Sequence, residues 1–109
     1  MRKITLPAIA LTFLVAATAG AQDAAKGEEV YTAQKCSTCH SIAGKGNKKG
    51  PLDGVGAKMS AADIHQWIVD PAAMTKKANA TRKPPMPVKY ASLPKADVDA
   101  MVAYLSSLK

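Results

Sequence analysis

The sequence predicts a small all-α domain. Beyond the first 21 residues, apolar side chains recur at helical spacing near both ends of the chain, and no stretch alternates with the period of a strand. A Cys-x-x-Cys-His motif at residues 36–40 places two thiols and an imidazole in one short segment. The remaining 88 residues contain few aromatic side chains. A core built from these residues alone would be only marginally stable, and a bulky apolar group would complete it.

Residues 1–21 have the pattern of an export signal. A basic start at Arg2 and Lys3 precedes an uncharged apolar run over residues 4–17, and small residues at Ala19 and Ala21 suit signal peptidase. We expect cleavage after Ala21, which leaves a domain over residues 22–109 in the periplasm. The apolar run is short for a bilayer span, so we expect no stable membrane insertion after cleavage, with an uncleaved anchor as the alternative.

The motif formed by Cys36, Cys39 and His40 is the arrangement that attaches haem c, in which both thiols bond to the porphyrin and the adjacent imidazole meets its iron. A closed zinc site needs four ligands, and outside the motif the chain adds only His65. A thioredoxin-like pair would follow a strand in a longer domain of alternating strands and helices. A disulfide would close only a four-residue loop. We therefore predict one covalent haem c with its iron.

The charge of the chain is basic, with a formal net charge of +7 that becomes +5 when Arg2 and Lys3 leave with the signal. Nucleic acid is an unsuitable partner, because Arg82 is the only other arginine, the lysines are dispersed and no aromatic platform accompanies them. Lysines near the predicted iron ligands would instead attract acidic protein partners; for any one of them, an ordinary solvated surface is the alternative. They are Lys35, Lys45, Lys48, Lys49, Lys83 and Lys89.

A methionine is the expected sixth ligand of the iron, because a soft thioether favours ferrous iron and raises the potential. Met86 lies among three prolines that restrict the backbone and stiffen an extended loop. The other candidates lie in or beside predicted helical stretches: Met59, Met74 and Met101. The sequence therefore favours Met86.

Two terminal helices are expected. The first covers residues 24–35 with Asp23 as its N-cap. Gly27 inside it costs about 1 kcal/mol relative to alanine, which indicates the close approach of another helix. The second covers residues 94–108 with a continuous apolar stripe, and Pro94 occupies its first helical position.

The segment between these helices is less regular. Residues 41–59 are rich in glycine and lysine, have no apolar periodicity and are predicted to form a loop. Ser60 caps a short helix that ends before Pro71 and has Trp67 on its apolar face. His65 falls one step off that face and is expected to be exposed. A further short helical stretch follows Pro71.

These features together resemble the class I c-type cytochromes, and the resemblance spans the whole mature chain. Gly27 and Tyr31 match the glycine and aromatic residue of that family at which the N-terminal helix crosses the C-terminal helix, opposite Met101 and Tyr104. The resemblance implies the cytochrome c fold, in which the terminal helices cross and shorter helices and loops wrap around one covalently bound haem.

The resemblance also assigns contacts with the haem. Residues 50–52 are similar to the Gly-Pro-x-Leu region of the family, with one residue fewer between proline and leucine. This implies that the Pro51 carbonyl accepts a hydrogen bond from His40. It also implies that Trp67 packs on the haem and donates its N–H to a propionate, with plain core packing as the alternative. The family places its axial methionine before a proline or short loop, which supports Met86.

The function implied by this resemblance is that of a periplasmic single-electron carrier whose haem cycles between Fe(III) and Fe(II). Its partners would be a membrane oxidase, reductase or dehydrogenase with an acidic docking surface, and the carrier would be a monomer. We expect no enzyme activity, because both axial positions are filled and no nucleophile, base and oxyanion constellation is present. The alternatives are a dedicated cytochrome c subunit of a periplasmic dehydrogenase or terminal oxidase, and a haem sensor or peroxidase.

Overall fold

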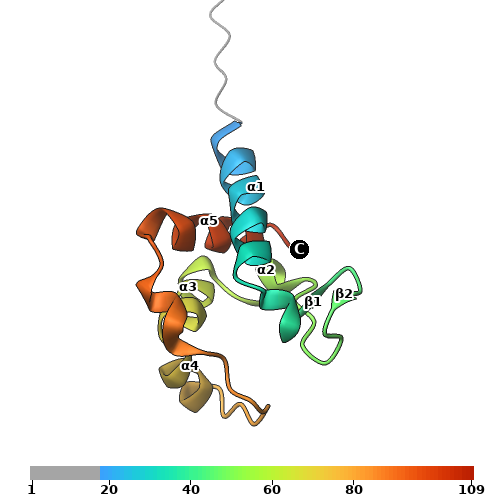
Figure 1. Ribbon diagram of the computed structural model, residues 1–109, viewed down its shortest axis with the longest axis vertical. Coiled ribbons are helices and arrows are strands. Elements are labelled where there is room, and N and C mark those ends of the chain that lie inside the picture. The colour runs from blue at the N-terminus through green and yellow to red at the C-terminus, as the bar shows by residue number, and fades with distance from the viewer. Residues whose placement is uncertain (1–17) are drawn as a thin grey trace, which may run out of the picture.

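The computed structural model describes residues 18–109 (Figure 1). Within this range the α-helices are α1 (Thr18–Ala33), α2 (Val55–Lys58), α3 (Ala61–Val69), α4 (Pro71–Lys77) and α5 (Lys95–Ser106). The 3-10 helices are η1 (Cys36–Thr38) and η2 (Val88–Ser92), and the two short strands are β1 (Ser41–Ile42) and β2 (Lys45–Gly46). The all-α prediction is confirmed, whereas most of the predicted signal, residues 1–17, lies outside the described residues.

Helices α1 and α5 cross and form the principal contact of the fold (Figure 1). Gly27 lies at the crossing, where a Cβ atom would overlap the carbonyl of Ala100 and the Cβ of Tyr104. Next to it, the rings of Tyr31 and Tyr104 meet edge to face with centroids 5.9 Å apart. The predicted crossing is therefore present, and the missing side chain of Gly27 allows it.

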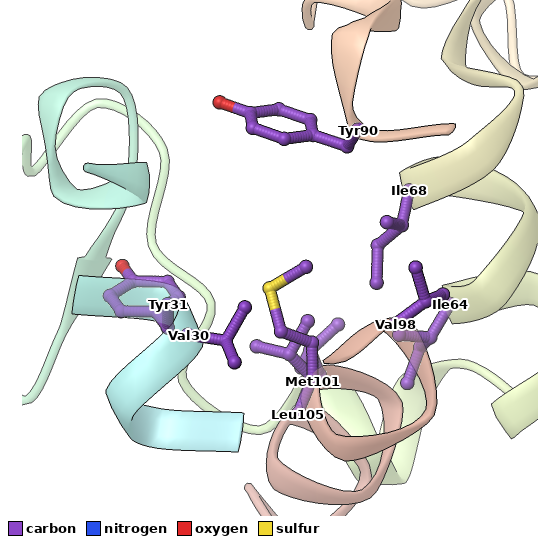
Figure 2. Close-up of a cluster of buried hydrophobic side chains, with 9 residues drawn as sticks. Val30, Tyr31, Ile64, Ile68, Tyr90, Val98, Met101 and Leu105 are labelled. Carbon is purple, nitrogen blue, oxygen red and sulfur yellow. The ribbon is translucent and has the colours of Figure 1, made fainter. Parts of the chain in front are cut away.

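The core lies where α1, α3, η2 and α5 meet (Figure 2). Every labelled side chain in that view is buried: Val30, Tyr31, Ile64, Ile68, Tyr90, Val98, Met101 and Leu105. No helix in the described part of the chain has the length and apolar character needed to cross a bilayer.

The ends of the terminal helices differ from the prediction. Asp23 lies inside α1 rather than at its N-cap, because residues 18–22 include no proline and the helix extends back to Thr18. At the other end α1 stops at Ala33, two residues early, because Lys35 adopts the left-handed conformation with φ 56° and ψ 39°. Pro94 has extended backbone angles and is the N-cap of α5, not its first helical residue.

The predicted loop over residues 41–59 contains short regular elements. Strands β1 and β2 pair antiparallel, with Ser41 opposite Gly46. Helix α2 is held by a contact with the C-terminus, because the N–H of Gly56 donates to the Leu108 carbonyl at 2.7 Å. The loop prediction was wrong for these elements because tertiary contacts, which leave no periodicity, stabilise them.

The middle helices follow the prediction closely. The hydroxyl of Ser60 accepts a hydrogen bond from the Asp63 N–H at 3.1 Å and caps α3. Helix α3 ends before Pro71, which begins α4. His65, predicted to be exposed, is half-buried on α3.

Replacement of Gly27 by alanine tests the crossing of α1 and α5. We expect Gly27→Ala to lower the free energy of unfolding by about 1–3 kcal/mol, because the new methyl group would overlap the α5 backbone. Denaturant unfolding of the purified protein measures the change. The neighbouring exposed residue provides the control, and Lys26→Ala should stay within about 0.5 kcal/mol of the parent. Equal stability of the two variants would contradict the close approach.

Candidate functional site

A partly open cavity of about 730 Å³ is bordered by the end of α1, by η1, α3, η2 and α5, and by the loop between α4 and η2. This volume lies within the range of about 300–1,000 Å³ typical of pockets for small molecules and cofactors. Figure 2 shows the ring of Tyr90 and the side chain of Ile68 bordering the open space, with the thioether of Met101 pointing into it. Its wall is mostly apolar and is formed partly by core residues: Tyr31, Val55, Ile64, Ile68, Met101 and Leu105.

One wall of the cavity carries the complete Cys-x-x-Cys-His motif. The Cys36 carbonyl accepts hydrogen bonds from the N–H groups of Cys39 at 3.1 Å and His40 at 3.0 Å, so the motif forms one tight turn. All three side chains line the cavity and are half-buried, and both thiols are free. Burial raises the pKa of the Cys36 thiol. The fold thus brings together the three groups that covalent haem attachment requires.

The imidazole of His40 is oriented by the loop that follows the motif. Its Nδ1 lies 3.0 Å from the carbonyl oxygen of Gly50. A carbonyl only accepts hydrogen bonds, so Nδ1 must carry the proton and Nε2 keeps a free lone pair for a metal. Burial lowers the pKa of His40 and so does the charge of Arg82, while the bond to Gly50 opposes them. Burial therefore favours the neutral imidazole that can bind a metal.

The hydrogen-bond acceptor predicted for His40 was wrong by one residue, because the carbonyl of Gly50 accepts and that of Pro51 does not. Backbone pairing explains the shift. The N–H of Ser41 donates to the same Gly50 carbonyl at 3.1 Å, and the N–H of Leu52 donates back to Ser41 at 2.8 Å. This bridge turns the Gly50 carbonyl toward the motif, and Pro51 lies exposed outside the cavity lining.

Asn47 is a supporting residue that the sequence prediction missed. Its backbone N–H donates to the carbonyls of Ser37 at 3.0 Å and His40 at 2.9 Å. Its side-chain amide donates to the Thr38 carbonyl at 3.2 Å, and its side-chain oxygen accepts from the N–H of Lys49 at 3.0 Å. Asparagine favours turns because its side chain can bond to the backbone two residues further on, as it does here with Lys49. The position of Asn47 in the sequence does not reveal which carbonyls it binds.

Met86 lines the cavity from the loop between α4 and η2, and it is half-buried against the core. Figure 1 shows this loop reaching from α4 toward the side of the molecule that holds η1 and β1. Among the other candidates, Met59 and Met101 also line the cavity, and Met74 does not. Three of the four candidate methionine ligands therefore line one cavity, and Met74 is left out of the choice.

The remaining lining residues supply apolar contact and positive charge. Trp67 lines the cavity from α3 and is half-buried, and its contact with haem stays a prediction. The cationic residues of the lining are Lys35, Arg82 and Lys89, and within the described chain no carboxylate lines the cavity. The other four lysines predicted near the ligands are exposed but do not line it.

These residues fit a haem. Two thiols, a neutral imidazole and a thioether are the ligand types that haem c uses, and cations without carboxylates suit the two acidic propionates of the porphyrin. The ring of Tyr31 also contributes to the cavity lining.

The fold and the cavity together define a protein that carries covalent haem c. The chain belongs to the cytochrome c family, because the family model for cytochrome c matches residues 24–109. Its cofactor is therefore haem c with iron, and its activity is haem-based electron transfer. Comparison with curated proteins and with solved structures returned no match.

Replacement of Gly50 by alanine tests whether the Gly50 carbonyl orients the imidazole of His40. A Cβ atom at residue 50 would overlap the Cys39 carbonyl and the guanidinium of Arg82. We expect Gly50→Ala to lower the free energy of unfolding by about 1–3 kcal/mol and to shift the NMR signal of the Nδ1 proton of His40. The control is Lys49→Ala, which changes an exposed neighbour. An unchanged proton signal in Gly50→Ala would show that this carbonyl does not orient the imidazole.

Proposed function

We propose that the protein is a class I cytochrome c that carries single electrons in the periplasm, with His40 and Met86 as the two axial ligands of the haem iron. The observation that carries the proposal is the presence of Met86 in the same cavity as the free Nε2 of His40. When bound, the haem supplies one iron that changes between Fe(III) and Fe(II). The chain's own residues hold this group and keep water from it.

The surroundings of the three thioethers favour Met86 over its competitors. Met101 is 3% exposed and belongs to the buried cluster beneath the α1–α5 crossing, where its removal would disturb the core. Met59 follows α2 and is 37% exposed, so solvent competes for its sulfur. Met86 is half-buried and lies on a loop, which can bring its sulfur to a metal without displacing a helix.

An electron carrier requires a filled coordination shell and a dry environment. With His40 and Met86 as ligands, the iron has no open position for a substrate, which favours a carrier over an enzyme. The mostly apolar wall keeps solvent away, and the thioether favours the ferrous state and raises the potential. The chain's leader pattern supports the periplasmic location, because it predicts export of the domain.

The cationic mouth of the cavity supports acidic protein partners. Lys35, Arg82 and Lys89 are exposed residues that also line the cavity, so their charges surround the place where an electron would leave. Such a field steers a partner of opposite charge toward the site and raises the rate of association. We infer a transient complex with a redox protein that presents carboxylates, which suits a monomeric shuttle.

Removal of the Met86 thioether tests the ligand assignment. We expect Met86→Ala to lose the six-coordinate low-spin spectrum and the weak sulfur-to-iron charge-transfer absorption of the ferric protein, and to have a lower reduction potential. The matched control is Met59→Ala, which removes the other partly exposed thioether of the lining and should keep both features. Optical spectroscopy and redox titration measure these properties.

Each other outcome of this experiment assigns a different site. Loss of the sulfur absorption in Met59→Ala and its retention in Met86→Ala would make Met59 the ligand. Absence of the absorption from the parent protein, together with carbon monoxide binding at neutral pH, would favour a haem sensor or peroxidase with an open iron position.

Reversing the charge of lysines that line the cavity tests whether their positive charge steers anionic partners to it. We expect the double variant Lys35→Glu/Lys89→Glu to be oxidised more slowly by the anionic reagent hexacyanoferrate(III), and the parent rate to fall as salt screens the charges. Stopped-flow absorbance measures both effects. The control Lys26→Glu/Lys109→Glu has the same net charge, but neither residue lines the cavity, so its rate should remain near that of the parent.

Equal rates in the two double variants would mean that the local field does not steer the reagent. Stable co-purification with a large partner at moderate salt would favour the dedicated enzyme subunit over the shuttle.

A further inference from the structure

Arg82 connects the two sides of the cavity. It belongs to the loop between α4 and η2, four residues before Met86. Its guanidinium lies on Gly50, in the space that a side chain at residue 50 would fill, and the Cys39 carbonyl borders the same point. The loop that carries one proposed ligand therefore rests on the backbone that orients the other ligand, His40.

The contact is one that glycine makes possible. A side chain on Gly50 would collide with the Nη1 and Cζ atoms of Arg82, so the guanidinium reaches the backbone only because residue 50 has none. Gly50 is itself held in place, since its N–H donates to the Asn47 carbonyl at 3.2 Å and its own carbonyl accepts from Ser41 and His40. The guanidinium of Arg82 therefore packs against a backbone segment that hydrogen bonds hold in place.

The chain between Arg82 and Met86 is short and restricted. It consists of Lys83, Pro84 and Pro85, and the two prolines have fixed φ angles and no N–H donors. Holding Arg82 therefore limits where Met86 can move.

We propose that Arg82 is a positioning residue that holds the Met86 loop against the His40 side of the cavity and so keeps the Met86 thioether at the iron. The inference rests on the proposed ligation by Met86. Its consequence is that loss of the contact makes the thioether easier to displace, even though Arg82 does not bind the iron.

Competition by imidazole measures this effect directly. A small ligand binds ferric iron only in molecules whose Met86 has moved away, so its apparent Kd reports the balance between closed and open loop. We expect Arg82→Gln to lower the apparent Kd for imidazole about fivefold, equivalent to about 1 kcal/mol. The matched control is Lys83→Gln, which removes a charge from the next residue, exposed and outside the cavity lining, and should change Kd less than twofold.

Two further variants separate the contact from the charge. Arg82→Lys keeps the charge without the planar guanidinium and should fall between the parent and Arg82→Gln. A double-mutant cycle with Gly50→Ala should be non-additive, because either substitution removes the same contact. Arg82→Lys also serves as the test variant in the event that Arg82→Gln does not fold.

The outcomes distinguish this inference from the proposed function. Equal Kd values for Arg82→Gln and Lys83→Gln, with the sulfur absorption present in the parent, would overturn the role of Arg82 alone. Additive effects of Arg82→Gln and Gly50→Ala would also overturn it. Absence of the sulfur absorption from the parent would instead overturn ligation by Met86.

Discussion

The close approach of α1 and α5 at Gly27 is the contact on which the rest of the structure depends. With no side chain between the helices, the backbone of α5 reaches α1, and Tyr31 and Tyr104 pack edge to face beside the crossing. The crossing places buried residues of both helices under one cavity, with α3 and η2 completing its wall. A chain of this size has few core side chains, so the cofactor fills the space that this crossing leaves open.

The His40 side of the cavity depends on backbone hydrogen bonds rather than on packing. The motif, Asn47 and Gly50 form a network in which nearly every acceptor is a main-chain carbonyl. Main-chain acceptors are held by the fold itself, so they set the tautomer of His40 and leave its Nε2 free. This explains how a segment with little regular secondary structure can orient the imidazole of His40.

The Met86 side has a different construction. Between α4 and η2 its loop contains no helix or strand and is restricted by three prolines. A stiff loop still needs a point of attachment, and the contact of Arg82 with Gly50 supplies one that also joins it to the His40 side. The two halves of the site are thereby coupled through a glycine that neither the motif nor the proline-rich segment contains.

Local chemistry was readable from the sequence because it depends on neighbours along the chain. Three such signals each depend on only a few consecutive residues: the spacing of Cys36, Cys39 and His40, the cap at Ser60 and the glycine at position 27. The α-helical class follows from the periodicity of the apolar residues. Four features could not be predicted from the sequence. They are the acceptor for His40, the short elements within residues 41–59, the grouping of three thioethers at one cavity and the contact of Arg82 with Gly50. Each joins residues through space, where a shift of one carbonyl, as from Pro51 to Gly50, changes the partner without changing the pattern.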